Sequence, residues 1–347
     1  MTKILKRRVI RRGRRLTEKA VLLAFTTLAL AVFVIGIIMT GSVPIEDGRR
    51  FMHLRGGISN NKNDNLVWVN SDSQPFNEGN VATQATHLII VAGHSVLISG
   101  DVKDSAREDS VWWLYDYQRH KGLPQAIVSH IQAGIKLALK DEKSLIVFSG
   151  GETRARTGPE TEGSSYFRVA DALHLWDGRD IYKKEGENLS TNKGSSTVRA
   201  RTTTEEYATD SFENLMFSIC RFREVTGNYP KEISVVSFSF KQQRFEKLHS
   251  SALQWPSNRF HYIGVDPSSS TGFNLEESSE GERKNSVLPF QTDPYGCHSD
   301  VLQQKRRDRN PYKRTPPYAL TCPEMKEVLN WCGPELISKS QVPWGLL

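Results

Sequence analysis

The sequence predicts an α/β domain with a doubly wound parallel sheet, preceded by one transmembrane helix near the N-terminus. Two observations predict the domain: short apolar runs recur along the middle of the chain, and longer segments with helical spacing of apolar residues separate them. Strands that alternate with helices form parallel sheets with right-handed crossovers. A third observation, 26 residues without a formal charge from Ala20 to Ile45, predicts the membrane helix.

The predicted transmembrane segment, residues 20–43, is long enough to span a bilayer. Ala20–Met39 is almost wholly apolar, and a helix of about 20 residues crosses a hydrocarbon core of about 30 Å. A cleaved signal peptide is the alternative, with a cleavage site near Thr40-Gly41-Ser42, but its apolar region would usually be shorter, about 7–15 residues.

Positive charge is concentrated before this segment. Residues 1–19 contain nine Lys and Arg residues and one acid, Glu18, so their net charge is +8. The whole chain has a net charge of +7, so the other 328 residues sum to −1. Basic flanks stay cytoplasmic, which predicts a single-pass protein whose body faces the lumen of the Golgi or endoplasmic reticulum. Because the rest of the chain has almost no net charge, no nucleic-acid partner is predicted for it. A nuclear signal, an RNA-binding arm and a mitochondrial presequence are alternatives for the basic run.

The folded domain is predicted at residues 86–267, after a polar stalk at 44–85. Segment 176–203 is charged and rich in Ser and Thr, which predicts an exposed insertion. Residues 268–347 are predicted to form a mobile linker and an extended arm that packs against the domain. The predicted strands are His87–Ala92, Ser144–Phe148, Glu232–Phe238 and Phe260–Val265, and the predicted helices are Asp109–Arg119, Pro124–Lys140, Gly163–Leu173, Thr204–Gly227 and Lys241–Leu253.

The four cysteines leave the redox state of the chain open. Cys220, Cys297, Cys322 and Cys332 allow three fully paired connectivities, and buried free thiols are the alternative. The spacing of Cys322 and Cys332 does not suit a zinc knuckle, so no metal site is predicted. Asn188, in Asn188-Leu189-Ser190, is a candidate glycosylation site in the insertion.

Candidate ligand-binding residues lie in loops after three predicted strands, because ligands of parallel sheets bind outside the carboxyl ends of the strands. Paired glycines let backbone N–H groups approach an anion, although Gly-Gly is also common as a plain turn. Lys241 and Arg244 suit an anion clamp, while Arg244 could instead pair with a carboxylate, and a lone His is more often structural. These candidates are Gly93, His94, Ser149, Gly150, Gly151, Ser237, Lys241 and Arg244.

Candidate catalytic residues are acidic. Glu152 follows the double glycine, and Glu206, Asp210 and Asn214 lie on neighbouring turns of a predicted helix start. We assign Glu152, Glu206 and Asp210 to acid/base or cation-ligand roles and Asn214 to ligand binding. Helix capping and dipole compensation are the alternative for Glu206 and Asp210.

The order of these motifs resembles the family catalogued as domain of unknown function 218, which includes the bacterial SanA, YdcF and ElyC envelope proteins. The resemblance covers residues 86–265, and the tail is similar to that of a eukaryotic, fungal-type branch. The motifs are Ile-Ile-Val-Ala-Gly93, Ser149-Gly150-Gly151-Glu152, Glu206-Tyr-Ala-Thr-Asp210-Ser-Phe-Glu-Asn214, Val-Val-Ser237 and Lys241-x-x-Arg244.

The resemblance implies a Rossmann-like three-layer fold, a cleft lined by these motifs and an envelope-related role without a settled reaction. One member of that family is linked with S-adenosylmethionine binding, but the resemblance does not identify a cofactor for this chain. Lys241 stands where bacterial members usually place a His, so a mechanism that needs a titrating imidazole there does not transfer.

Three functions are compatible with the sequence. The first is a lumenal enzyme that acts on a phosphorylated, nucleotide-linked, glycan or lipid-carrier molecule. The second is a non-catalytic module that holds an anionic ligand or a partner in the same cleft. The third is a scaffold whose tail recruits membrane partners.

Overall fold

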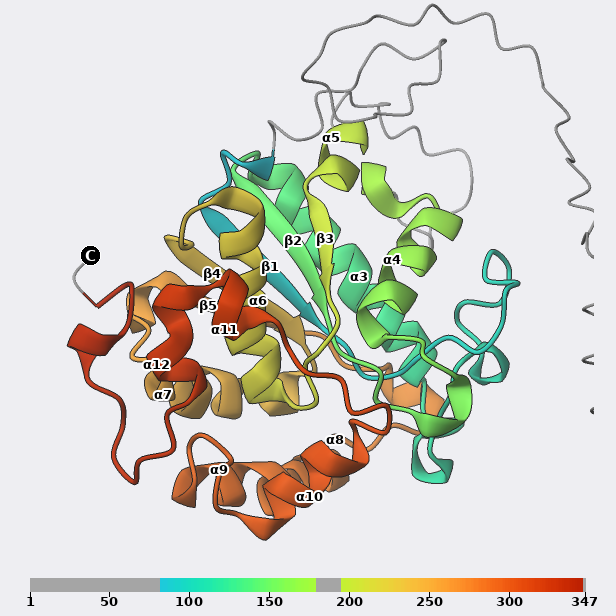
Figure 1. The fold of residues 1–347 in the computed structure, drawn as a ribbon. Coiled ribbons are helices and arrows are strands. Elements are labelled where there is room, and N and C mark those ends of the chain that lie inside the picture. The colour runs from blue at the N-terminus through green and yellow to red at the C-terminus, as the bar shows by residue number, and fades with distance from the viewer. Residues whose placement is uncertain (1–81, 179–194, 346–347) are drawn as a thin grey trace, which may run out of the picture. The chain divides into compact units, whose positions relative to one another are not determined.

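A five-stranded sheet forms the centre of the domain (Figure 1). The computed structural model describes residues 82–178 and 195–345. The strand order is β3-β2-β1-β4-β5, and every neighbouring pair is parallel. The strands are β1 (His87–Ala92), β2 (Ser144–Ser149), β3 (Thr202–Glu205), β4 (Glu232–Ser237) and β5 (Phe260–Gly264).

The central strands are buried on both faces because alternate residues belong to two separate cores. In β1, Leu88 and Ile90 face one core, whereas Ile89 and Val91 face the other. All four side chains are fully buried. A continuous apolar run is the pattern expected of such a strand.

Helices cover both faces of the sheet (Figure 1). Helices α3 (Leu123–Lys140) and α4 (Glu162–Ala172) pack on one face, and α6 (Ser211–Thr226) packs on the other. A π-helical segment, Arg244–His249, lies near β5 and continues into α7 (Ser250–Ala252). The predicted α/β class and parallel sheet are therefore confirmed.

Helix α3 approaches β1 closely because residue 134 is glycine. A Cβ added at Gly134 would meet Val91 Cγ2 at 2.5 Å. The helix begins after Gly122, whose φ of +72° lies in the left-handed region, and has Pro124 in its first turn.

The chain between residues 195 and 211 differs from the prediction. Helix α5 (Ser195–Ala200) and strand β3 occupy part of the predicted insertion, and the helix predicted from Thr204 begins only at Ser211. Consecutive β-branched threonines suit an edge strand. Asp210 caps the helix, because its carboxylate accepts a hydrogen bond from Glu213 N at 3.0 Å. Asn188 lies outside the described residues.

Much of residues 268–347, predicted to form a mobile linker and an extended arm, is helical. It contains α8 (Leu275–Glu282), a π-helical stretch, Arg283–Val287, and α9 (Leu288–Thr292), with α10 (Asp300–Asp308) after them. These helices lie across the carboxyl end of the sheet (Figure 1).

The last part of the chain packs on the α6 side of the sheet. It contains α11 (Tyr318–Thr321) and α12 (Lys326–Leu329), and residues of both helices join the core there. Trp344 is 1% exposed and donates to Leu253 O at 2.9 Å.

One disulfide, Cys297–Cys332, joins the segment before α10 to the segment after α12. The other two cysteines, Cys220 and Cys322, are buried free thiols. None of the helices within 82–178 and 195–345 has the length and apolar character needed to cross a bilayer. The predicted span, 20–43, lies outside the described residues.

Candidate functional site

A pocket of about 710 Å³ opens at the carboxyl end of the sheet. Gly93 and His94 reach it from β1, and Ser237 reaches it from β4. The chain order reverses between these two adjacent strands, because β1 is followed by β2 on one side and β4 by β5 on the other. Ligands of open parallel sheets bind at such a switch point, and this volume suits a small organic molecule.

His94 links Lys241 to Ser237 at the floor of the pocket. Lys241 Nζ lies 3.2 Å from His94 Nδ1, and His94 Nε2 lies 3.2 Å from Ser237 Oγ. When Lys241 is charged, its ammonium only donates, so Nδ1 accepts and Nε2–H donates to the serine. In that protonation state His94 cannot take the Ser237 proton.

The enclosure of these groups shifts their titration. Burial, followed by the Lys241 charge, lowers the pKa of His94 well below its usual range. Burial also lowers the pKa of Lys241 to about 7, and the nearby Arg244 charge acts in the same direction. Lys241 is therefore the group in this trio that changes protonation near neutral pH.

Three cations of the pocket form no ion pair with a carboxylate of the described residues: Lys241, Lys305 and Arg309. Lys305 Nζ donates to Asn285 O at 2.9 Å, and Arg309 Nη1 donates to Thr209 O at 3.2 Å. Burial and then the Arg309 charge lower the pKa of Lys305 to about 8. The pocket thus holds positive charge that its own side chains leave unbalanced.

Arg244, predicted to clamp an anion, is already paired. Its Nε lies 2.6 Å from Glu282 Oε1, and both side chains are almost completely buried. The pair ties the start of the π-helical segment to the end of α8. This contact matches the alternative interpretation, in which Arg244 pairs with a carboxylate and stabilises local structure.

The double glycine does not offer its N–H groups to a ligand. Gly150 N donates to Glu205 O at 2.9 Å and Gly151 N donates to Ala208 O at 2.8 Å. A Cβ at Gly150 would meet Glu162 Cβ at 2.7 Å, so glycine permits close packing against α4. Neither glycine lines the pocket.

Two of the predicted catalytic acids, Glu152 and Glu206, do not line the pocket. Glu152 is buried and accepts a hydrogen bond from Arg314 Nη1. Glu206 is half-buried and accepts one from Thr204 Oγ1 at 3.0 Å. The helix prediction placed Glu206 on a turn beside Asp210, whereas the extended backbone at β3 separates them.

Asp210 lines the pocket but is fixed in its charged form. Arg306 Nε lies 2.7 Å from its carboxylate. Burial would raise the pKa of Asp210, but the Arg306 charge outweighs it, and the pKa falls to about 2. Asp210 is therefore a helix cap and ion-pair partner that does not exchange protons near neutral pH.

A buried network behind the pocket includes a residue that the sequence did not nominate. Asn214, which lines the pocket, donates through Nδ2 to Ser149 Oγ at 2.8 Å, and Ser149 Oγ donates to Glu205 Oε2 at 2.7 Å. Burial raises the pKa of Glu205 to about 7. Ser149 and Glu205 do not line the pocket, so they support its wall.

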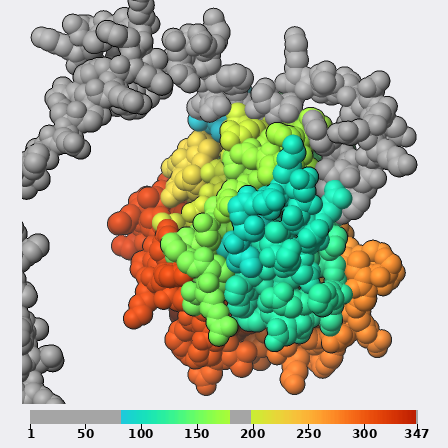
Figure 2. Space-filling view, turned by 90° about the vertical axis from the view of Figure 1, so that its right-hand side faces the viewer, coloured from blue at the N-terminus to red at the C-terminus, as the bar shows by residue number. Residues whose placement is uncertain are grey.

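Aromatic side chains form two walls that the sequence reasoning also missed. Tyr115 and Tyr117 stack with ring centroids 5.4 Å apart, and Phe238 and Phe240 stack at 5.1 Å. The aromatic-rich run Trp112–Tyr117 is the sequence feature that could have indicated the tyrosine wall. The segment that carries the tyrosines, coloured teal, covers much of the face seen in Figure 2.

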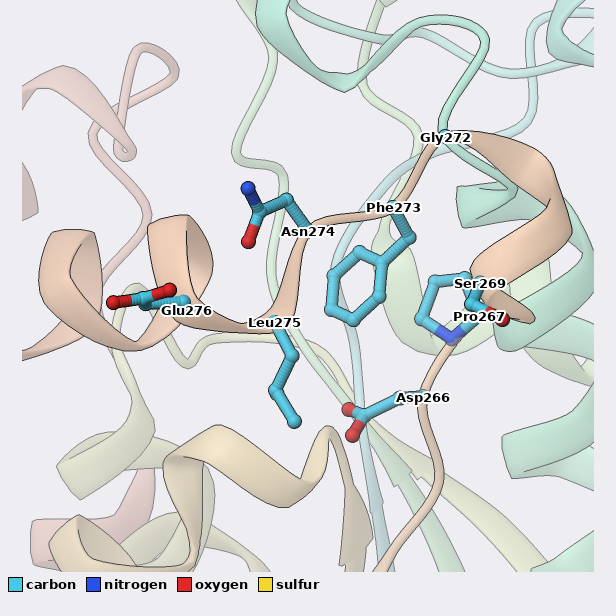
Figure 3. Close-up of a pocket in the computed structure, with 8 residues that line it drawn as sticks. All are labelled: Asp266, Pro267, Ser269, Gly272, Phe273, Asn274, Leu275 and Glu276. Atoms are coloured by element: carbon cyan, nitrogen blue, oxygen red, sulfur yellow. The ribbon is translucent and has the colours of Figure 1, made fainter.

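A neighbouring pocket of about 510 Å³ shares Pro267 and Phe273 with the first (Figure 3). Asp266 lines it, but its carboxylate already accepts Ser239 N at 2.9 Å. In Figure 3 the rings of Phe273 and Pro267 lie beside each other, so this region extends the apolar side of the site.

The fold and site define an α/β protein with a cationic, aromatic-walled pocket at the switch point of a parallel sheet. Over 266 residues it is 30% identical to the uncharacterized protein YOR238W of Saccharomyces cerevisiae, and the match covers 68% of this chain and 87% of the yeast protein. The chain belongs to the same family as that yeast protein. No family model and no solved structure matches the chain.

Proposed function

We propose that the chain is a membrane-anchored lumenal protein whose pocket binds a phosphorylated organic molecule and acts on it. The observation that carries this proposal is the group of unpaired pocket cations, Lys241, Lys305 and Arg309. Burial and, after it, neighbouring positive charges lower the pKa of Lys241 and Lys305, and a bound anion would offset the effect of those charges. A phosphate offers several charged acceptors to Lys and Arg donors at once.

If the protein is catalytic, Lys241 is the proposed proton donor or acceptor. It reaches the pocket, it contacts His94 at 3.2 Å, and its pKa of about 7 suits proton transfer near neutral pH. The carboxylates proposed from sequence are less suited, because Glu152 and Glu206 lie outside the pocket lining and Asp210 is paired with Arg306.

Binding without turnover is the second candidate function. It is favoured by the pairing of every carboxylate that lines the pocket with a Lys or Arg, since acid/base chemistry commonly uses two titrating groups. These carboxylates are Glu162, Asp210, Glu277 and Glu282. Turnover of a bound ligand would rule it out.

Two further proposals, on the family and on the location of the protein, rest mainly on the sequence. Membership of domain of unknown function 218, with a Rossmann-like fold, is supported by motifs of β1 and β4 that meet at one pocket. Lumenal topology is supported by the basic segment 1–19, the apolar segment 20–43 and the Cys297–Cys332 disulfide, because disulfides persist in oxidising compartments. Digestion of the body by protease in intact microsomes would contradict this topology.

A ligand screen tests the pocket. The full chain in detergent is melted with phosphate, pyrophosphate, nucleotides, sugar nucleotides, S-adenosylmethionine and polyprenyl phosphates. We expect a phosphorylated compound to raise Tm for the wild type and much less for Lys305→Met. Lys231→Met is the matched control, because Lys231 is exposed beside the amino end of β4. No stabilisation by any phosphorylated compound would refute the proposal.

A further inference from the structure

An exposed aromatic surface at the pocket is not explained by phosphate binding alone. Tyr117 is 67% exposed and Tyr115 is 37% exposed, and both line the pocket. Their rings are nearly parallel, at an interplanar angle of 10°. Two stacked aromatic rings exposed beside a binding site offer a flat face to which a planar ligand group can stack.

Tyr115, one of the two stacked rings, is held in place by several contacts. The Arg154 guanidinium lies 4.9 Å from the Tyr115 ring centroid and 5.0 Å from that of Trp113. Arg154 is itself buried, and its Nη2 donates to His94 O at 3.1 Å. The Tyr115 backbone N donates to Gln118 Oε1 at 3.0 Å. Tyr115 is therefore fixed relative to the β1 loop, which reduces the entropy cost of stacking.

The tyrosines and the unpaired cations belong to one pocket. Tyr115 and Tyr117 line the same cavity as Lys241, Lys305 and Arg309. Lys305 lies in α10 and Arg309 is the residue that caps the C-terminal end of this helix. A ligand in the pocket's volume of about 710 Å³ can span the two subsites.

We propose that the ligand is a phosphate monoester that carries a planar aromatic ring, a nucleoside monophosphate in chemical class. Its phosphoryl group binds Lys241, Lys305 and Arg309, and its ring stacks on the Tyr115–Tyr117 pair. This proposal rests on the proposed function, because it uses the same cation subsite. It adds a second subsite that discriminates among phosphorylated molecules.

The test compares ligands that contain one or both parts. Dissociation constants for the full chain are measured with inorganic phosphate, ribose 5-phosphate, phenyl phosphate, adenosine 5′-monophosphate and adenosine. We expect the two aromatic phosphates to bind about tenfold tighter than ribose 5-phosphate. Adenosine alone is expected to bind weakly.

Two variants separate the subsites. Tyr117→Ala is expected to remove the advantage of the aromatic phosphates and leave ribose 5-phosphate unchanged, while Tyr117→Phe, which keeps the flat ring, matches the wild type. Lys305→Met is expected to weaken every phosphorylated ligand about tenfold or more. Equal binding of ribose 5-phosphate and adenosine 5′-monophosphate, with both sensitive to Lys305→Met, would overturn the ring subsite and leave the proposed function standing. Binding by none of the phosphates would overturn both.

Discussion

Lys241 Nζ lies 3.2 Å from His94 Nδ1, between the ends of two adjacent parallel strands, β1 and β4. The contact joins two groups that both prefer to be neutral in this environment, because the pKa of each is lowered by burial and by neighbouring positive charge. A bound anion would favour the charged lysine. The site is therefore arranged so that ligand binding and protonation are coupled.

Ligand affinity is expected to fall as pH rises from about 7 to 9. Lys241, with a pKa of about 7, and Lys305, with a pKa of about 8, lose their protons over this range in the free protein. Binding at pH 8 must then take up protons, which calorimetry in buffers of different ionisation enthalpy measures. Lys305→Arg should make the fall shallower, because arginine stays charged. Affinity that does not change with pH would contradict the coupling.

Replacing Lys241 by Met is expected to stabilise the unliganded protein at pH 7 while weakening phosphate binding. The change removes a buried amine and its repulsion from Arg244, and it keeps an apolar chain of similar length. We expect Tm to rise by roughly 2–4 °C, the shift that about 1 kcal/mol causes in a domain of this size. Lys231→Met should leave Tm unchanged.

The sign of the pH effect gives a second measurement on the same variant. The folded-state pKa of Lys241 is below its unfolded value of about 10.4, so the unfolded chain binds more protons between about pH 7 and 10. Its contribution makes folding stability rise with pH across this window. The rise should be smaller in Lys241→Met, and an identical pH slope would contradict the lowered pKa.

The sequence predicted those strands and helices whose own residues show a hydrophobic pattern. Short apolar runs identified β1, β2 and β4, and three- and four-residue spacing identified α3, because burial on two faces or on one stripe imposes those patterns. Strand β5 was also predicted, although it is an edge strand whose residues are mostly half-buried or exposed. Strand β3 was missed because its threonines are half-buried at the sheet edge and leave no apolar run. Local capping signals at Thr204 favoured a helix that edge pairing with β2 prevents.

The site was predicted less completely, because its charges are paired over long sequence distances. His94, Ser237 and Lys241 meet as their positions after adjacent strands suggested. The partners of Glu152 and Asp210 are Arg314 and Arg306, which come from the C-terminal segment. No periodicity in the sequence indicates such contacts, so the sequence could not show that two of the acids predicted to be catalytic are held in ion pairs.

Asp210→Ala is expected to destabilise the protein by about 3 kcal/mol or more. It removes a helix cap and leaves Arg306 with only the Glu213 carboxylate, 3.3 Å away, in a largely enclosed position. Asp210→Asn keeps a capping oxygen, so we expect a smaller loss of stability. That smaller loss measures the contribution of the carboxylate charge alone. Chemical denaturation measures both.

Acid titration tests the same ion pair. Because the pKa of Asp210 is about 2 when folded and about 3.9 when unfolded, its contribution is present above pH 4 and is lost as pH falls towards 2. In Asp210→Asn this loss should be smaller. Equal acid sensitivity of variant and wild type would show that Arg306 does not hold the Asp210 charge.

The docking of α8 is expected to depend mainly on its buried ion pair, because a second one, Lys121–Glu277, is exposed to solvent. Glu282 is the buried residue of this helix, and its carboxylate lies 2.6 Å from Arg244 Nε. Glu282→Ala leaves a buried guanidinium without its partner, at a cost of roughly 3 kcal/mol. Hydrogen exchange should accelerate in Leu275–Glu282 more than in α3. Arg244→Met combined with Glu282→Leu should restore much of the protection, because an apolar pair needs no desolvation of charge. Unchanged exchange in Glu282→Ala would mean that other contacts hold α8 over the pocket.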